Sequence, residues 1–448
     1  MPEKTTPTSR RRFIVTADGD GVINHAGSAA LTELADTLDL TRGLSLAMAG
    51  TRKRRSAHDP GRVLRDMGVM LADGGDCLSD LCVLRDQGEL FEKVASSPTA
   101  LRVVYSVGDE QLAGIRKARR RAREKAWKKG AAPSQVVLDF DATLVTAHSD
   151  KEDAAGNYKG GFGFHPLFCH LDGRNPQALA GMLRPGKAGS NTADDHIEVL
   201  EMAIDQLPDS AIADDVKILA RADSAGATHG FLNALREKKI NFSVGFDLTE
   251  PVREAILATP DRAWVEAITQ QGEVREGAAV CELDNLDLSA WPEGTRAICR
   301  RERPHPGAQL TFSDHNGYRF QVFITDQDGF DLATLEARHR AHARVEDRIR
   351  CGKDTGLANL PFREFRHYEV WLELVLAAQD LISFFQALCL TGDAARWEPK
   401  KLRYRLLHVA ARVVRSGRRT FVKLQHNWRW SEQLRQAFDR LYALQLTT

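Results

Sequence analysis

The chain has 448 residues, which is too long for one compact core, so we expect two to four domains. Its hydrophobic content of 43% and charged content of 27% are ordinary for a soluble globular protein. The net charge is only +1, so any preference for nucleic acid must come from local clusters of Lys and Arg. The seven cysteines include no Cys-x-x-Cys pair, which excludes a disulfide framework or structural zinc site and indicates a reducing compartment.

We expect a cytoplasmic protein without a membrane partner. The most apolar stretch, residues 371–390, is interrupted by Glu373, Gln379 and Asp380, and therefore predicts a buried core helix. The arginines at residues 10–12 resemble a twin-arginine export signal, but the apolar stretch that such a signal requires does not follow them.

Residues 1–130 form a predicted helical, DNA-binding N-terminal region. We expect a flexible basic tail up to about residue 26, and helical patterns follow it. Asp59 and Pro60 are typical of a helix start, and Gly74 and Gly75 end that helix. The pattern fits a helix–turn–helix-like module and a plain helical bundle equally well.

The strongest cluster of cations lies in the helix that Asp109 begins. Its second half, residues 116–129, has nine Lys and Arg side chains and one acid, Glu124. On a helix these cations occupy most of the circumference, so local ion pairs neutralise few of them. Contact with nucleic acid is therefore favoured over a solvated linker helix. The predicted DNA-binding residues of this helix are Arg116, Lys117, Arg119, Arg120, Arg121 and Arg123.

Beyond Pro133 the hydrophobic period changes from helical to two, as in strands. Three strands, a helix, a strand, a helix and a strand follow, which is the order of a ribonuclease-H-like α/β core. We expect the first part of this core at 131–246, a β-rich insertion at 247–318, and the second part at 319–390. Residues 391–448 are expected to be a basic helical region for DNA contact or dimerisation.

Two predicted strands of this core contain candidate catalytic acids. In the strand at 136–145, alternation places Asp139, Asp141 and Thr143 on one face, opposite apolar residues. Acids inside an apolar strand are costly unless they are paired or bind a metal, although an edge strand with a solvated face is the simpler alternative. The strand at 216–221 is followed by Asp223 and a turn of small residues, where α/β sheets place ligands. A strand-ending Asp also commonly caps the next helix.

A third acid lies on the long helix expected at about 332–350. Helical spacing places His339, His342, Glu346, Arg350 and Lys353 along one stripe. Taken alone, this stripe is best interpreted as a charged solvent face. Together with Asp141 and Asp223, Glu346 could complete a set of carboxylates for two-metal phosphoryl transfer, with the cations contacting DNA phosphates.

The order Asp141, Asp223, Glu346 resembles that of the DDE transposases of bacterial insertion sequences, in the branch with a β-rich insertion before the Glu. In that family the Glu helix has Tyr, Arg, Glu and Lys at spacings of three, four and seven, where this chain has His339, His342, Glu346 and Lys353. The Asp-x-Thr pattern of the family falls on Asp141. The segments 139–148, 158–166, 221–224 and 356–361 are also similar.

The resemblance implies a transposase that cuts element ends and transfers the 3′ ends into target DNA. It further implies two Mg²⁺ ions, with Mn²⁺ tolerated, held by Asp141, Asp223 and Glu346. The expected partner is double-stranded DNA, bound by a homodimer on paired ends, in a cytoplasmic, nucleoid-associated protein.

Two alternatives stay open. Asp139 and Asp141 fit the DxDxT motif of haloacid-dehalogenase-like phosphatases, in which the first Asp is the nucleophile. The chain could also be a DNA-binding derivative of a transposase that no longer catalyses. A metal-dependent cleavage assay separates these hypotheses.

Overall fold

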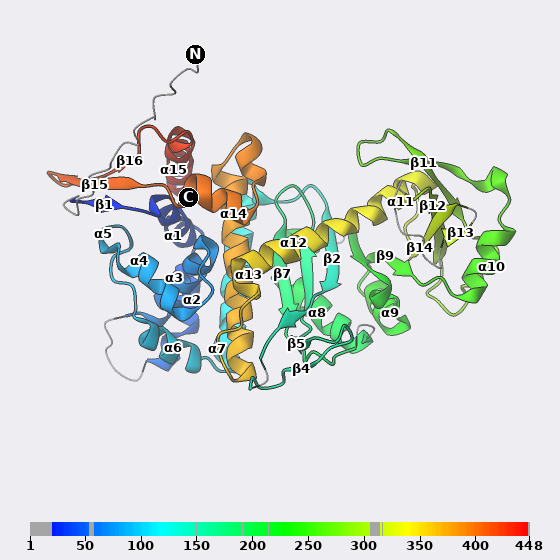
Figure 1. Ribbon diagram of the computed structural model, residues 1–448, viewed down its shortest axis with the longest axis horizontal. Coiled ribbons are helices and arrows are strands. Elements are labelled where there is room, and N and C mark those ends of the chain that lie inside the picture. The colour runs from blue at the N-terminus through cyan, green and yellow to red at the C-terminus, as the bar shows by residue number, and fades with distance from the viewer. Residues whose placement is uncertain are drawn as a thin grey trace, which may run out of the picture.

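The computed structural model describes residues 20–52, 58–148, 150–189, 192–213, 215–304, 314–315 and 317–446. The molecule is elongated (Figure 1). Helices from both ends of the sequence form one end, a mixed sheet with its helices forms the middle, and a β-rich segment forms the other end.

The central sheet has the strand order of a ribonuclease-H-like fold. Its strands run β7-β6-β2-β8-β9; β6 is antiparallel to β2 and β7, whereas β2, β8 and β9 are parallel. Helices α8 and α9 pack on one face, where the ring centroids of Phe140 and Phe231 lie 5.2 Å apart. This architecture confirms the predicted fold class. The elements are β2 (Val136–Ala142), β6 (Leu167–Leu171), β7 (Gln177–Met182), α8 (Ala193–Gln206), β8 (Ile218–Ala222), α9 (His229–Glu237) and β9 (Asn241–Phe246).

The β-rich segment continues the central sheet. Strand β14 pairs antiparallel with β9, and β12, β11 and β10 extend the sheet outward in that order. Helix α10 precedes these strands, and β13 pairs with β14. The elements are α10 (Glu250–Ala258), β10 (Val265–Ile268), β11 (Val274–Glu282), β12 (Arg296–Glu302), β13 (Asp314–His315) and β14 (Tyr318–Thr325).

The helical end is one shared core formed from the first and last parts of the chain. The Asp59 side chain accepts a hydrogen bond from the Arg62 amide at the start of α3, and Gly74, with φ 110°, ends the helix. Nearly every residue of α3 is buried, so this helix is a core element and not an exposed recognition helix. The helices are α1 (Ala29–Thr37), α2 (Leu40–Ala47), α3 (Pro60–Asp73), α4 (Cys82–Arg85), α5 (Gly88–Phe91), α6 (Ser97–Tyr105), α7 (Asp109–Ala126), α14 (Pro399–Leu402) and α15 (Ser431–Leu446).

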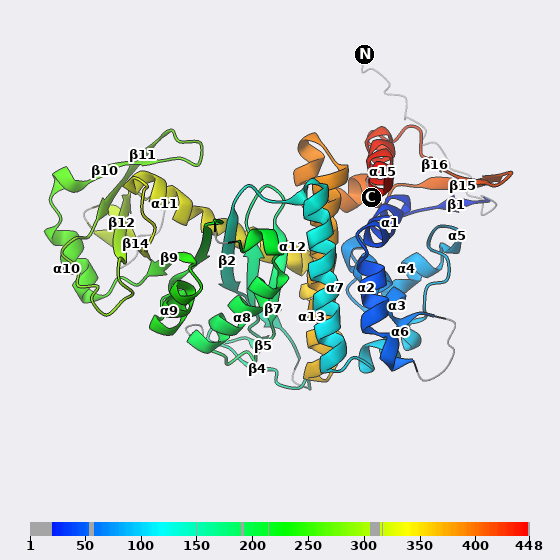
Figure 2. The same cartoon turned by 180° about the vertical axis from the view of Figure 1, so that it is seen from behind.

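Helix α13 (Phe365–Cys389) joins the helical end to the sheet. It is the one helix of the described residues long and apolar enough to cross a membrane, but 83% of its most apolar window is buried in the protein. It packs beside α7 and against β7 (Figure 2). The prediction of a buried core helix at 371–390 is therefore confirmed.

The C-terminal region is not wholly helical, and this part of the prediction was wrong. Strands β15 (Ala411–Ser416) and β16 (Arg419–Leu424) form a hairpin, which pairs with β1 (Val22–Ile23). A second small sheet contains β3 (Val145–Thr146), β4 (Ala155–Gly156) and β5 (Phe162–Phe164), and borders the carboxyl end of β2.

Candidate active site

Strand register brings the two aspartates together. Strands β2 and β8 are parallel, and Phe140 is paired with Ala222. Continuing this register by one residue places Asp223 opposite Asp141, at the carboxyl ends of adjacent strands. Such strands lie about 4.8 Å apart. Asp141 is half-buried, whereas Asp223 is exposed and also accepts a hydrogen bond from the Ala225 amide.

Glu346 reaches the same edge from a helix. Helix α11 (Leu332–Arg340) packs against β10, β11 and β12, and α12 (Arg344–Gly352), joined to it by a 3₁₀ turn, packs against β2. His342 Nδ1 lies 2.9 Å from Asp139 Oδ1. Four residues of helix rise about 6 Å, and two residues of strand about 6.6 Å. Glu346 lies one helical turn beyond His342, and Asp141 lies two strand residues beyond Asp139. These two steps have nearly the same length, so Glu346 comes beside Asp141.

The charges of these acids act on one another. The pKa of Asp141 is raised to about 6, first by burial and then by the carboxylates of Asp223 and Glu346, although His342 opposes the shift. Like charges this close disfavour the ionised form, and a bound cation favours it. The structure thus brings together the three predicted acids.

Asp139, two residues earlier on β2, has a different role. It is 2% exposed, and Arg221 donates to both of its carboxylate oxygens at 2.8 and 2.7 Å. Burial alone would raise its pKa, but the hydrogen bond with His342 and the charge of Arg221 lower it. An enclosed carboxylate paired in this way cannot serve as the nucleophile that the phosphatase alternative requires.

Sequence reasoning missed the role of Arg221. It pairs with Asp139 across β2 and β8 and also bonds Asp172 at 2.7 Å. Its side chain therefore holds the acid-bearing strand against its neighbours. The signal was present in the sequence, because parallel pairing of the two predicted strands places Arg221 beside Asp139.

Lys353 and Arg350, the two cations predicted to follow Glu346 on its helix, have different surroundings. Lys353 is near Asp141: burial lowers its pKa, Lys159 adds to this, and Asp141 opposes it. Arg350 instead pairs with Asp347 at 3.1 Å and with Glu398 at 3.0 Å. Phosphate contact by Lys353 and Arg350 remains a prediction.

The two histidines of that helix have structural contacts. His339 stacks on Phe323 with ring centroids 4.2 Å apart and bonds the Ser243 hydroxyl at 3.0 Å. Burial lowers its pKa to about 3, so the ring is neutral. One ring face and the Nδ1 atom of His339 are therefore used inside the protein, and DNA contact through its Nε2 remains a prediction. His342 uses one ring nitrogen for Asp139, so only the other could reach a phosphate.

Two arginines of the basic run on α7 are internal, which corrects the prediction that Arg119 and Arg123 contact DNA. Arg119 is 2% exposed and bonds Glu373 at 2.8 Å and Asp380 at 3.0 Å. Arg123 is fully buried and bonds Asp380 at 2.6 Å. These arginines join α7 to α13, and neither can reach a DNA phosphate.

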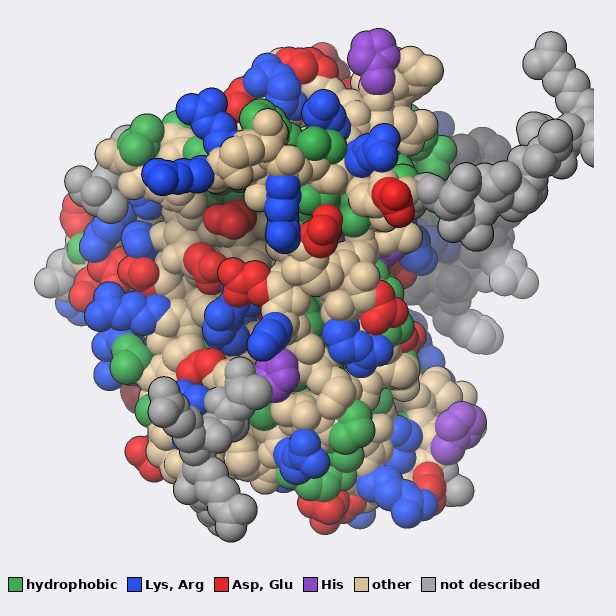
Figure 3. Space-filling view, turned by 90° about the vertical axis from the view of Figure 1, so that its left-hand side faces the viewer, with side chains coloured by type: hydrophobic (Ala, Val, Ile, Leu, Met, Phe, Trp, Pro, Cys, Tyr) green, Lys and Arg blue, Asp and Glu red, His purple; other side chains and the backbone are tan. Residues whose placement is uncertain are grey.

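The remaining cations of α7 are more accessible. Arg116 and Arg120 are partly exposed but pair with Glu373 and Asp209, both at 2.6 Å. Lys117 and Arg121 are exposed, and their contact with DNA remains a prediction. On the helical end seen in Figure 3, Lys and Arg side chains are interspersed with Asp and Glu and form no continuous basic surface.

The donor set at the three acids fits hard divalent ions. Asp141, Asp223 and Glu346 supply only carboxylate oxygens, which favour Mg²⁺ or Mn²⁺ over softer metals. Their ligand oxygens do not all lie within 4.8 Å of one another, which is wider than a closed site for one ion. That spread is compatible with two ions about 3.5–4 Å apart.

Comparisons with known proteins find a matching family and a similar solved structure. No match was found among curated proteins. Among solved structures, the chain is similar to the piggyBac transposase in a cryo-EM structure of its synaptic complex with hairpin DNA. The identity is 10% and the TM-score 0.44, covering 85% of this chain and 80% of that chain. Residues 5–446 match the family described as transposase DDE domain group 1. Since this match spans nearly the whole sequence, the chain belongs to that family of DDE transposases.

Proposed function

We propose that the protein binds the terminal inverted repeats of an insertion sequence, hydrolyses the DNA at these ends and transfers the 3′ ends into target DNA. The observation that carries the proposal is the meeting of Asp141, Asp223 and Glu346 at one sheet edge. There the pKa of Asp141 is raised to about 6 by burial and by its two acidic neighbours.

Asp141, Asp223 and Glu346 would hold two Mg²⁺ ions, with Mn²⁺ as a working substitute. Such ions activate the attacking oxygen and stabilise the leaving oxygen in phosphoryl transfer. The chain's own contribution is to fix the carboxylates in place. Arg221 and His342 clamp Asp139, which holds β2, β8 and the Glu346 helix in register.

Lys353 would bind a DNA phosphate beside these acids. Its half-buried ammonium lies close enough to Asp141 for the two charges to interact. A cation there offsets the charge of an approaching phosphate. The protein would act as a homodimer on paired ends, in the cytoplasm and on the DNA of the nucleoid.

The test is cleavage of a duplex that contains the element's end sequence, with Mg²⁺, Mn²⁺ or EDTA. Glu346→Gln should lower cleavage in Mg²⁺ by several orders of magnitude without changing DNA affinity, because the metal ligand acts on the transition state. The matched control is Asp347→Asn. Asp347 is exposed and pairs with Arg350, so its loss should cost at most about 1 kcal/mol and leave cleavage intact.

Near-normal cleavage by Glu346→Gln would contradict the assignment of the third acid. A wild-type protein that binds the ends but never cleaves them would support the non-catalytic alternative.

A further inference from the structure

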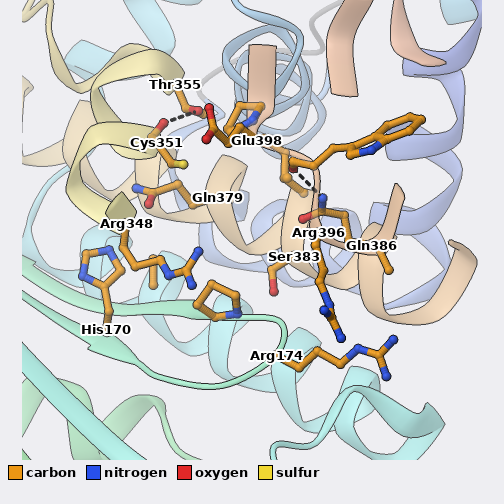
Figure 4. Close-up of a pocket in the computed structure, with 16 residues that line it drawn as sticks. His170, Arg174, Arg348, Cys351, Thr355, Gln379, Ser383, Gln386, Arg396 and Glu398 are labelled. Carbon is orange, nitrogen blue, oxygen red and sulfur yellow. Dashed lines mark hydrogen bonds between the residues drawn. The ribbon is translucent and has the colours of Figure 1, made fainter. Parts of the chain in front are cut away.

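A polar cavity lies beside α12, the helix that contains Glu346. Its volume is about 190 Å³, and it is enclosed by α12, α13, β6, the turn between β6 and β7, and residues 395–399 (Figure 4). Arg348 on α12 lines this cavity, two residues after Glu346. Two residues on a helix are about 200° apart, so the cavity and the catalytic acids lie on opposite sides of α12.

Three arginines of the cavity have no acidic partner. Arg174, Arg348 and Arg396 line it, and among the described residues none of them forms an ion pair or a side-chain hydrogen bond. Glu398 is the one acid in the lining, and its carboxylate bonds Arg350 at 3.0 Å. Figure 4 shows the Arg174 and Arg396 side chains extending toward the same end of the cavity. Three cations therefore line the cavity, and its one carboxylate is paired elsewhere.

Buried polar atoms of the cavity are also unsatisfied. His170 is 3% exposed and Ser383 4% exposed, and the Ser383 hydroxyl and the Nε of Arg348 have no hydrogen-bond partner. The Gln379 side chain interacts with the His170 ring, but neither ring nitrogen has a partner in hydrogen-bond geometry. A buried polar group left unpaired costs about 1–3 kcal/mol. Burial, reinforced by Arg348, lowers the pKa of His170 to about 4 despite the opposing Gln379 side chain, so its ring is a neutral donor and acceptor. These groups match a ligand rich in acceptor oxygens.

The cavity opens into a larger basic groove of about 910 Å³. Arg174, Arg348 and Arg396 line both spaces. Arg338 and Arg344 extend the groove along α11 and α12, and residues 268–272 of the β-rich segment form its rim. Asp172 is the one acid of this lining and pairs with Arg344 at 3.1 Å. The groove thus follows the side of the helix that faces away from Glu346.

We propose that this groove binds the sugar–phosphate backbone of DNA and that one phosphate enters the arginine cavity. The cavity is smaller than the ~300–1,000 Å³ of small-molecule sites, which suits one phosphate group at the end of a longer polymer. Arginine presents a planar set of donors that matches phosphate oxygens. The inference rests on the proposed function, since it gives a transposase a second DNA contact, separate from the catalytic edge.

The test is the salt dependence of DNA binding by Arg174→Gln/Arg396→Gln. Both residues are exposed and unpaired within the described chain, so the double variant should fold normally. Binding of a random-sequence duplex in EDTA should weaken, and the slope of log K against log salt should fall by about 1.8, or 0.9 per phosphate contact. The matched control is Arg102→Gln/Arg435→Gln, which removes two exposed arginines at the helical end and should leave the slope unchanged.

A parallel arm separates DNA from free phosphate. Inorganic phosphate is titrated at constant ionic strength, and its binding is followed by calorimetry. An unchanged slope in Arg174→Gln/Arg396→Gln overturns the inference. If the slope is unchanged and phosphate binds the wild-type protein but not this variant, the ligand of the cavity is a free anion and not DNA. If the wild type cleaves DNA with metal but the slope of the double variant is unchanged, only the groove proposal is overturned. If the slope of the variant is lowered but the wild type does not cleave, only the proposed catalysis is overturned.

Discussion

Replacing Asp141 by Asn should abolish cleavage and yet stabilise the metal-free protein. The site destabilises the ionised form of the Asp141 carboxylate, because burial and two acidic neighbours raise its pKa to about 6 from an ordinary value of 3.8. An acid with a raised folded-state pKa favours the folded state only while it is protonated. That contribution is complete below about pH 4 and is lost as the pH rises to about 6.

The magnitude follows from the shift. One pKa unit corresponds to 1.36 kcal/mol, so a shift of about two units is worth up to about 3 kcal/mol at neutral pH. Asp141 is half-buried, so solvent screening should leave about 1–2 kcal/mol. Asparagine carries no charge at any pH. Asp141→Asn should therefore be more stable than the wild type at pH 7.5 and equally stable near pH 4.

The assay is urea unfolding in EDTA at several pH values, repeated with Mg²⁺. Added Mg²⁺ should stabilise the wild type more than the variant, since the ion offsets the clustered charge. Asp139→Asn is the matched control on the same strand. It leaves Arg221 buried with one partner fewer, and the loss of one member of such a pair typically costs about 3–5 kcal/mol.

The two substitutions should therefore shift stability in opposite directions. A metal-free Asp141→Asn protein that is less stable than the wild type at pH 7.5 would refute the argument, because the acid would then be held by favourable contacts.

Two further predictions concern groups outside the catalytic edge. Arg119→Gln should lower the free energy of unfolding by about 3–5 kcal/mol, because Glu373 and Asp380 lose a buried partner; an unchanged urea midpoint would contradict this. Burial opposes the charged form of His408, but its hydrogen bond and charge interaction with Asp73 raise the His408 pKa. This contribution is present below about pH 6.5 and is lost as the pH rises through the folded-state pKa. His408→Gln should therefore flatten the stability curve as the pH rises above about 6.5, and a curve of unchanged slope would show that another group titrates.

The sheet and its acids were predictable from local pattern. Apolar and polar residues alternate on the strand of Asp141, and an apolar run ends at Asp223. Both patterns belong to short segments, so they can be recognised without knowing the fold. Parallel pairing then follows from the βαβ order and brings the two acids together. The position of Glu346 needed the family resemblance, since its helix alone is indistinguishable from a solvated face.

The environment of α7 could not be predicted in this way. Its run of cations suggests an exposed surface, because the acids that neutralise Arg119 and Arg123 lie on α13, more than 250 residues later. Similarly, the cations between Arg412 and Lys423 were interpreted as a helix, whereas pairing with β1 from the other end of the chain supports a hairpin. Both errors concern partners that are distant in sequence.

The hydrogen bonds between β9 and β14 have a consequence for how the molecule can move. Four residue pairs join these strands, from Ser243 with Thr325 to Phe246 with Val322, so the β-rich segment and the core share one continuous sheet. A linker between two domains permits rotation, but a sheet bends only gradually and resists shear along its strands. Any DNA that the β-rich segment holds would keep a constant distance from Asp223, which follows the strand next to β9. The position of the cut would then be measured by the protein's own framework and not by a hinge.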